Sequence, residues 1–438
     1  MIRTARRLFF SSLKVCIKLV VTTLFKLKLD GILSIFMGTI IILCNKNEIY
    51  HNKKKFGILA IKKLIFNEDI KILKKYPSNY KILFFPYPLK NSKVGVLGGM
   101  WPEEIQKQTE FYTKKDKYES LFERCSKLFY DTLDFIERVS QVEVKIILTA
   151  NIDYWQDYPW IATIHKKNGK FVVLGKESIL YSSDITKRRF SRLKEYGFIY
   201  EGDAVLFYNE LAKKTYVSSG VVKINQSFVT GCPRVDILTS LAKNKKSNEK
   251  FILFATFMTS LHGAAKSVKL GNEILDLIYQ DELLREKTII KCKNSREERT
   301  IGKKYPGLCV VSGPIEKYLK KNPAIFVGFN STSCLDALIA RIPTVVPWWG
   351  DAKKVGKGAL LGEHTSDFHL IGHNKESLKK ILKEHTSNNQ SYKEAKAMAY
   401  HPKLKKIVEK KYSPIDGMNC QRFFKVIDKL VLDDRVEK

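Results

Sequence analysis

Short apolar runs alternate with amphipathic stretches along most of the chain, beginning at about residue 53. A short, almost wholly apolar run is typical of a strand buried on both faces of a parallel sheet, and apolar residues at helical spacing are typical of the covering helices. The alternation therefore predicts an α/β fold with doubly wound parallel sheets. The runs that predict strands are Lys81–Pro86, Val94–Leu97, Val144–Leu148, Phe171–Leu174, Asp203–Tyr208, Gln226–Thr230, Phe251–Ala255, Thr288–Lys291, Leu308–Val311, Ala324–Gly328 and Thr344–Val346.

The α/β pattern occurs twice, which predicts two Rossmann-like domains. The polar, lysine-rich stretch Thr239–Lys250 separates the two series and is predicted to be the linker. A length of 438 residues and a hydrophobic content of 44% fit two domains that each bury a core. The predicted organisation is a basic, apolar helical segment at 1–52, a first domain at 53–240, a second domain at 241–398, and C-terminal helices at 399–438 able to cross back.

The stretch Ala324–Pro347 predicts a strand, a polar turn, a short helix and a second strand. The turn, Asn330-Ser331-Thr332-Ser333, places an amide and small hydroxyls beside the unpaired backbone N–H groups of the helix start. Such a helix start attracts anions, so the turn predicts a phosphate site. The alternative is that Asn330 or Ser331 only caps the helix.

A second motif, Gly231-Cys232-Pro233-Arg234-Val235-Asp236, follows the strand predicted at Gln226–Thr230. Glycine and proline favour a tight, rigid turn. The planar guanidinium of Arg234 suits a phosphate or carboxylate, and Asp236 can hold Arg234 or cap the following helix. The alternative is a plain loop that an Arg234–Asp236 pair braces.

Carboxylates follow two predicted strands of the first domain, where α/β proteins place their ligands. Asp153 lies in the aromatic loop that follows Val144–Leu148, and Glu177 follows Phe171–Leu174 in Gly175-Lys176-Glu177-Ser178. A carboxylate in an apolar setting can act as a general base. The alternatives are a surface turn with a hydrophobic plug for the first loop, and a surface Lys176–Glu177 pair for the second.

The chain is strongly basic, with 77 Lys and Arg residues against 45 Asp and Glu residues and a formal net charge of +32. This balance indicates an anionic partner, such as a phosphorylated substrate or an anionic lipid. No nucleic-acid-binding motif accompanies the lysines, so nucleic acid is not the expected partner. The eight cysteines are scattered without metal-ligand spacing, which argues against a disulfide framework or zinc site and fits a reducing cytosol.

The first 44 residues are basic and apolar together. The uncharged run Gly31–Cys44 is only 14 residues long, whereas a spanning helix needs about 20. The composition favours an amphipathic anchor lying in the plane of an anionic membrane. The alternative is that these residues form ordinary helices packed on the first domain.

The motifs resemble those of GT-B glycosyltransferases, in particular the surface-carbohydrate and capsule transferases and the related CDP-glycerol glycerophosphotransferases. Val229–Asp236 (VTGCPRVD) matches one turn of that family. Phe329–Leu338 (FNSTSCLDAL), followed by Ile342–Pro347 (IPTVVP), matches another. The resemblance implies two Rossmann-like domains facing a cleft, with a nucleotide-activated donor on the second domain and Arg234 at the cleft.

The resemblance also implies site residues. Ser331, Thr332 and Ser333 would contact the donor phosphates. Asp336 occupies a position where the family often has an acid. The other candidate binding residues are Asp236, Lys291 and Asn330, together with Thr259, Ser260 and His262 in the hydroxyl-bearing loop after Phe251–Ala255. The base that deprotonates the acceptor hydroxyl would be Glu177 or Asp153. No Asp-x-Asp sequence stands in a metal-binding position, so metal-independent catalysis without a cofactor is expected, with helix dipoles, Arg and Lys neutralising the leaving group.

The sequence departs from the family in two places. Ile290-Lys291-Cys292-Lys293-Asn294 stands where a Lys-Pro-His-Pro sequence is usual, and an N-terminal histidine–glycine turn is absent. These departures favour sugar transfer over glycerol-phosphate transfer. The expected acceptor is a glycan or lipid-linked molecule at the inner face of the cell membrane, where the protein would be peripheral. A non-hydrolysing sugar-nucleotide epimerase and a non-catalytic membrane-surface scaffold are the alternatives.

Overall fold

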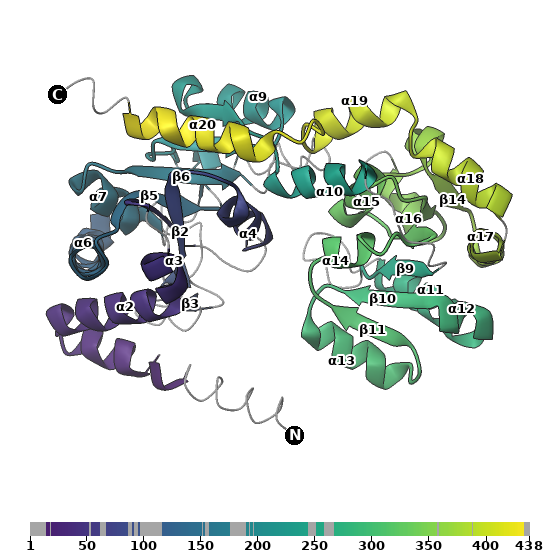
Figure 1. Ribbon diagram of the computed structural model, residues 1–438, viewed down its shortest axis with the longest axis horizontal. Helices are drawn as coiled ribbons and strands as arrows, with labels where there is room; N and C mark the ends of the chain where they lie inside the picture. The colour runs from purple at the N-terminus through teal and green to yellow at the C-terminus, as the bar shows by residue number, and fades with distance from the viewer. Residues whose placement is uncertain are drawn as a thin grey trace. The chain divides into compact units, whose positions relative to one another are not determined.

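The computed structural model describes most of the chain. The described residues are 15–17, 19–51, 54–61, 67–85, 90–91, 95–96, 116–150, 152–153, 157–175, 190–191, 193–195, 197–243, 251–257, 267–356, 359–387 and 389–432. The chain forms two compact units (Figure 1). Unit 1 comprises Met1–Ile179, Lys187–Pro233 and Cys420–Lys438, and unit 2 comprises Leu180–Thr186 and Arg234–Asn419.

Unit 1 contains a six-stranded parallel sheet with the order β2-β1-β5-β6-β7-β8. The strand order changes direction between β1 and β5, and in open α/β sheets ligands bind beyond the carboxyl ends of the strands at such a point. The strands are β1 (Phe56–Ala60), β2 (Tyr80–Phe84), β5 (Glu143–Thr149), β6 (Lys170–Gly175), β7 (Ala204–Phe207) and β8 (Ser227–Val229).

One prediction for unit 1 needs correction. The run Val94–Leu97 does not supply a strand to this sheet, because β4 (Gly95–Val96) pairs antiparallel with β3 (Lys90–Asn91) in a separate two-stranded sheet. Further along the chain, Asp116–Tyr118 is a 3-10 turn, and α6 runs from Glu119 to Ser140. The other helical elements are α3 (Lys46–His51), α4 (Asn67–Lys75), α7 (Tyr158–Lys166), α9 (Glu210–Ser218) and η6 (Ile224–Gln226).

The helix α20 (Asn419–Leu432) packs on unit 1 from Cys420 onward, although it is far from that unit in sequence. Phe423 and Ile427 are fully buried. The ring of Phe424 stacks on Tyr80 with centroids 6.3 Å apart, and the Tyr80 hydroxyl donates to Asp428 Oδ1 at 2.9 Å. The last helix is therefore part of the covering layer of the first sheet.

The N-terminal helix α2 (Asp30–Cys44) packs against α6 in unit 1 (Figure 1). Its inner face buries Leu33, Met37 and Ile41, and Arg124 on α6 donates two hydrogen bonds to the carboxylate of Asp30, both 2.7 Å. The inner face of α2 thus confirms the alternative given for the N-terminal segment, that its helices pack on the first domain. Among the described residues, every helix is too short or too polar to cross a bilayer.

Unit 2 contains a second six-stranded parallel sheet, with the order β11-β10-β9-β12-β13-β14. Here the order changes direction between β9 and β12. The two sheets confirm the predicted α/β class. The strands are β9 (Ile252–Ala255), β10 (Thr288–Cys292), β11 (Cys309–Ser312), β12 (Ile325–Val327), β13 (Thr344–Pro347) and β14 (Leu370–Gly372).

Helices flank this sheet and connect its strands. The helix α10 (Pro233–Lys243) extends into the stretch that the sequence predicts as a linker. The others are α11 (Ser267–Gln280), α12 (Glu282–Lys287), α13 (Ser295–Lys304), α14 (Glu316–Leu319), α15 (Thr332–Ile339), α16 (Asp351–Val355), η9 (Glu363–Phe368), α17 (Lys375–Ser387), α18 (Asn389–Met398) and α19 (Pro402–Lys411).

Candidate functional site

The candidate site lies at the carboxyl edge of the second sheet, where β9 and β12 are neighbours. Aromatic residues follow three adjacent strands there: Phe257 after β9, Phe329 after β12 and Trp348 after β13. Phe329 lies between the other two, with ring centroids 5.7 Å from Phe257 and 6.3 Å from Trp348. All three are buried, so they form an apolar cluster beside the ends of these strands.

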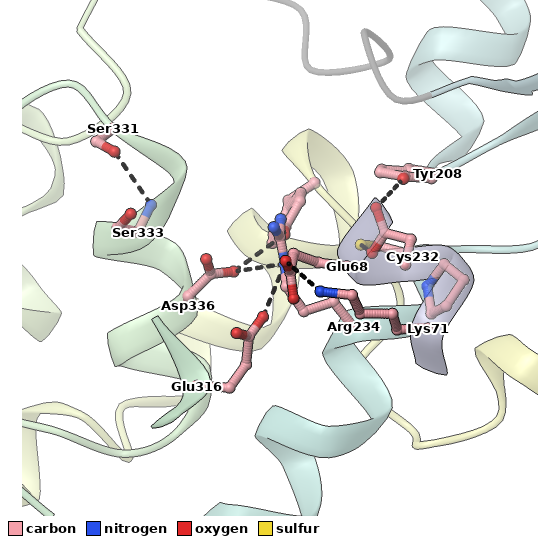
Figure 2. Close-up of polar contacts among 12 residues, drawn as sticks. Glu68, Lys71, Tyr208, Cys232, Arg234, Glu316, Ser331, Ser333 and Asp336 are labelled. Atoms are coloured by element: carbon pink, nitrogen blue, oxygen red, sulfur yellow. Dashed lines mark hydrogen bonds and ion pairs between the residues drawn. The ribbon is translucent and has the colours of Figure 1, made fainter. Parts of the chain in front are cut away.

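The turn after β12 has a fixed geometry. Asn330 adopts a left-handed backbone with φ of +45°, which asparagine tolerates better than most residues, and its side-chain oxygen accepts from the Leu360 N–H at 3.1 Å. Ser331 is the N-cap of α15 and accepts from the Ser333 N–H at 3.3 Å (Figure 2). The capping alternative is therefore confirmed for Ser331.

Capping leaves other donors at this helix start. Within the part of the chain that the structure describes, neither the Thr332 N–H nor the hydroxyls of Thr332 and Ser333 have a hydrogen-bond partner. Both side chains are half-buried. These groups can donate to an anion in addition to the favourable helix dipole.

Arg234 lies in a buried polar cluster of unit 2 (Figure 2). Its Nε is 3.7 Å from Asp336 Oδ1 on α15 and 3.7 Å from Glu316 Oε1 on α14. Its Nη2 donates to the hydroxyl of Tyr412 at 2.5 Å, and that hydroxyl donates to Asp336 Oδ1 at 3.0 Å. Tyr412 and Asp336 are almost completely buried. The cluster therefore ties α10, α14 and α15 to the end of α19.

Lys291 adds a second cation at the same edge, near the end of β10. It is half-buried, and this burial lowers the pKa of its ammonium group, whereas the nearby carboxylates of Glu316 and Asp336 raise it. Two cations and two carboxylates thus share this part of unit 2. Their charges compensate one another, as buried charges must if they are to remain ionised.

Asp236 accepts hydrogen bonds from the first residue of α20. Its Oδ1 accepts from the backbone N–H of Asn419 at 3.0 Å and from the Asn419 side-chain amide at 2.7 Å. Asn419 begins α20, so Asp236 caps that helix rather than the one on which it lies. Of the predicted site residues, Arg234 and Lys291 lie near Asp336, and Asn330 and Ser331–Ser333 stand at the start of α15, the helix that carries Asp336.

In unit 1, Asp153 follows β5 and is buried. It therefore lies beyond the carboxyl end of a strand that borders the change in strand order. Asp157, in the same loop, accepts from the Thr149 hydroxyl at 2.6 Å and has a structural partner. Four of the predicted residues lie outside the described residues: Glu177, Thr259, Ser260 and His262.

A histidine of unit 1 lies at the other edge of the first sheet. His165 on α7 contacts Asp203 at 2.8 Å, and Asp203 also accepts from the Phe171 N–H at 2.7 Å, at the amino ends of β6 and β7. This edge is opposite to the one at which α/β proteins bind ligands. Its contact with Asp203 supports a structural role.

Sequence reasoning missed two residues of the cluster, Tyr412 and Glu316. Glu316 follows β11, so its place after a predicted strand was a signal. Tyr412 lies in the helical tail, and no local pattern distinguishes it from other tyrosines. Among the described residues, no group of three or more His, Cys, Asp or Glu side chains could hold a metal ion.

No family model matches the sequence, and no curated protein matches it either. Solved structures are nevertheless similar in fold. The wall teichoic acid polymerase TagF, in a variant soaked with CDPG, is 13% identical over 96% of this chain and 98% of its own, with a TM-score of 0.51.

Two further solved structures are similar at lower TM-scores. They are HepE of Anabaena in complex with UDP and glucose (9% identity, 86% and 100% coverage, TM-score 0.44) and the UDP-GlcNAc 2-epimerase of Methanocaldococcus jannaschii (13%, 85% and 99%, 0.42). At these identities the comparison establishes the fold alone. The chain has the two-domain α/β fold of GT-B proteins, which confirms the fold expected from the motifs.

Proposed function

We propose that this protein is a glycosyltransferase that moves a sugar from a nucleotide-activated donor to a surface-polysaccharide or lipid-linked acceptor. The observation that carries the proposal is the carboxyl edge of the second sheet, where the start of α15 and Lys291 offer donors and positive charge. This edge is at the change in strand order, the usual ligand site of such sheets.

The donor diphosphate would lie at the start of α15. The N–H of Thr332 and the hydroxyls of Thr332 and Ser333 would donate to its oxygens, together with the dipole of the helix. The Lys291 ammonium would supply the full positive charge that stabilises the departing nucleotide. Because burial lowers the pKa of Lys291, a bound diphosphate would raise it again and favour the charged amine.

Arg234 and Asp336 would act on this site indirectly, by holding α15 in place. The Asp336 carboxylate accepts from Tyr412 and lies beside Arg234, so it is already engaged within unit 2. It lies on α15, the helix whose first turn would contact the diphosphate. The cluster would therefore hold that helix, and Arg234 is proposed as a positioning residue.

The acceptor hydroxyl would lose its proton to a carboxylate of unit 1. Asp153 is the candidate among the described residues, and it is buried beyond the carboxyl end of β5. Glu177 is the second candidate. General-base catalysis contributes about 10²–10⁴ in rate. Asp153→Asn is therefore expected to lower kcat by about 10² or more while leaving donor binding unchanged, and an unchanged kcat would reject Asp153 as the base.

The test begins with binding. Titration calorimetry with UDP, CDP, CMP, GDP and ADP is expected to identify one preferred nucleotide. Lys291→Met is expected to weaken it about 10-fold or more, because a charged hydrogen-bond donor is lost. Lys293→Met is the matched control, since Lys293 is only two residues away but has an exposed side chain. Equal affinities for the two variants would place the nucleotide elsewhere.

Turnover separates this function from its alternatives. A transferase releases free nucleotide in an acceptor-dependent reaction, and we expect this release to continue in EDTA. An epimerase alters or liberates the sugar without an acceptor, and a scaffold does neither. Nucleotide-sugar consumption that is independent of every glycan or lipid-linked acceptor offered would contradict the proposal.

A further inference from the structure

The N-terminal part of unit 1 presents an apolar surface to solvent. Six large apolar residues there are each more than half exposed, although α2 packs its inner face against α6. We call this surface the N-terminal apolar patch. Its residues are Val15, Leu19, Leu27, Ile32, Ile35 and Leu43. Exposed apolar residues gathered in this way mark an interaction site more often than scattered ones do.

The patch has a defined face on α2. Ile32, Ile35 and Leu43 are spaced by three and eight residues, which places them on one side of a helix, and the buried Leu33 and Met37 face α6. Asp30 is the one charged residue of α2, and it is held by Arg124. The helix therefore has one apolar side that packs against α6 and another apolar side that is exposed to solvent.

The N-terminal segment that carries the patch is predominantly basic. Residues 1–50 contain eight basic and two acidic residues. Both acidic side chains are paired within unit 1: Asp30 with Arg124 at 2.7 Å, and Glu48 with Lys74 at 3.0 Å. Lys26, Lys28 and Lys46 are exposed beside the patch. The segment thus combines exposed apolar side chains with exposed lysines.

From this combination we infer that the N-terminal apolar patch docks on an anionic lipid bilayer. The apolar residues would enter the acyl boundary, and the lysines would contact the anionic headgroups. A second copy of the chain is disfavoured, because a symmetric contact would bring like-charged lysines together. The inference extends the proposed function by placing a lipid-linked acceptor at the surface where the enzyme binds, but the docking itself is measurable without any substrate.

Vesicle flotation with the full chain tests this inference. We expect the protein to float with vesicles of phosphatidylcholine and phosphatidylglycerol, and much less with phosphatidylcholine alone. The triple variant Ile32→Ser, Ile35→Ser and Leu43→Ser is expected to bind about 10-fold more weakly or worse. The matched control changes three other exposed apolar residues of unit 1 to serine, Val139, Ile199 and Ile224, and is expected to float like the parent.

A second pair of variants tests the charge. Lys26→Glu with Lys28→Glu is expected to weaken flotation with anionic vesicles about 10-fold or more, whereas Lys194→Glu with Lys214→Glu, both exposed in unit 1, should change it little. Thermal unfolding checks that all variants fold.

Three results would overturn the inference: no flotation with anionic vesicles, equal loss in the patch variants and their controls, or a solution dimer that the triple serine variant dissociates. Nucleotide binding is measured separately, so its absence would reject the proposed function and leave the docking intact.

Discussion

At the scale of single residues, the cluster around Arg234 concentrates opposite charges in a buried place. Arg234 and Lys291 face Glu316 and Asp336, and the hydroxyl of Tyr412 links Arg234 to Asp336. Burying such groups costs free energy unless each one is paired and hydrogen-bonded. The arrangement is therefore expected to be sensitive to the loss of a single polar atom.

Tyr412→Phe removes that hydroxyl alone. We expect a loss of about 1–3 kcal/mol in the free energy of unfolding, because the Asp336 carboxylate loses a buried hydrogen bond. Denaturant unfolding measures it, with Tyr279→Phe, also in unit 2, as the control. A double-mutant cycle with Asp336→Asn should give a coupling energy of about 0.5 kcal/mol or more. Additive effects would show that the bond has no energetic role.

His369 gives unit 2 a pH dependence. The side chain is buried, with Nε2 2.9 Å from the Thr365 hydroxyl and Nδ1 3.1 Å from the Leu370 carbonyl oxygen. Burial lowers the pKa of His369 from its ordinary 6.5 to about 4. In the unfolded chain the histidine therefore takes up a proton below about pH 6.5, whereas the folded one resists protonation until about pH 4.

His369 is thus expected to make its full contribution to the free energy of unfolding above pH 6.5 and to lose it as the pH drops towards 4. The contribution of His369 over this window is about 3 kcal/mol. Urea unfolding at pH 7 and pH 5, compared between the parent chain and His369→Gln, isolates it from other titrating groups. A parent and variant that lose stability equally between these pH values would contradict this assignment.

At the scale of elements, the contact between α2 and α6 depends on Gly38. A Cβ built at Gly38 would lie 2.5 Å from the ring of Phe135 on α6, whereas one built at Gly31 in the same helix would meet nothing within 4 Å. Glycine therefore lets the two helices approach closely. The α2 part of the N-terminal apolar patch, Ile32, Ile35 and Leu43, depends on this contact, because these residues lie on the exposed side of the same helix.

The two glycines provide a matched pair of variants. Gly31→Ala is expected to raise stability by up to about 1 kcal/mol, since alanine is the better helix former. Gly38→Ala is expected to lower it by about 1 kcal/mol or more, because overpacking against Phe135 outweighs that gain. Hydrogen exchange of the α2 amides should quicken only in the second variant. Equal stabilisation by both changes would mean that Phe135 moves aside freely.

At the scale of the whole molecule, the chain closes its first unit with its last helix. Phe423 and Ile427 of α20 are buried in unit 1, while the preceding stretch Arg234–Asn419 belongs to unit 2. The first sheet therefore lacks part of its cover until the C-terminal residues are added. The stability of unit 1 therefore depends on α20, which lies more than 300 residues after β1 and β2 in the sequence.

Phe423→Ala tests this coupling. Truncating a buried phenylalanine costs about 3–5 kcal/mol, so hydrogen exchange should quicken in β1 and β2 of unit 1. Protection of β9 and β12 in unit 2 should stay unchanged, as should that of the exposed-site control Lys425→Ala. Loss of protection in the strands of unit 2 alone would show that α20 stabilises the other unit.

The sequence by itself determined the elements and the turn chemistry. The short apolar runs predicted ten strands of the two main sheets, because burial on both faces leaves a local pattern of apolar residues. The Asn330–Ser333 turn and the Arg234 motif were likewise visible, since small polar residues before a helix and a Gly–Pro pair have local conformational causes.

Only the tertiary structure decided which of these elements meet. The order of the strands, with its change between β9 and β12, depends on the crossover connections and not on any single run. Tyr412 joins Asp336 across 76 positions, and Asp236 caps a helix that begins at Asn419. Such contacts depend on packing between distant segments, and local periodicity carries no information about them.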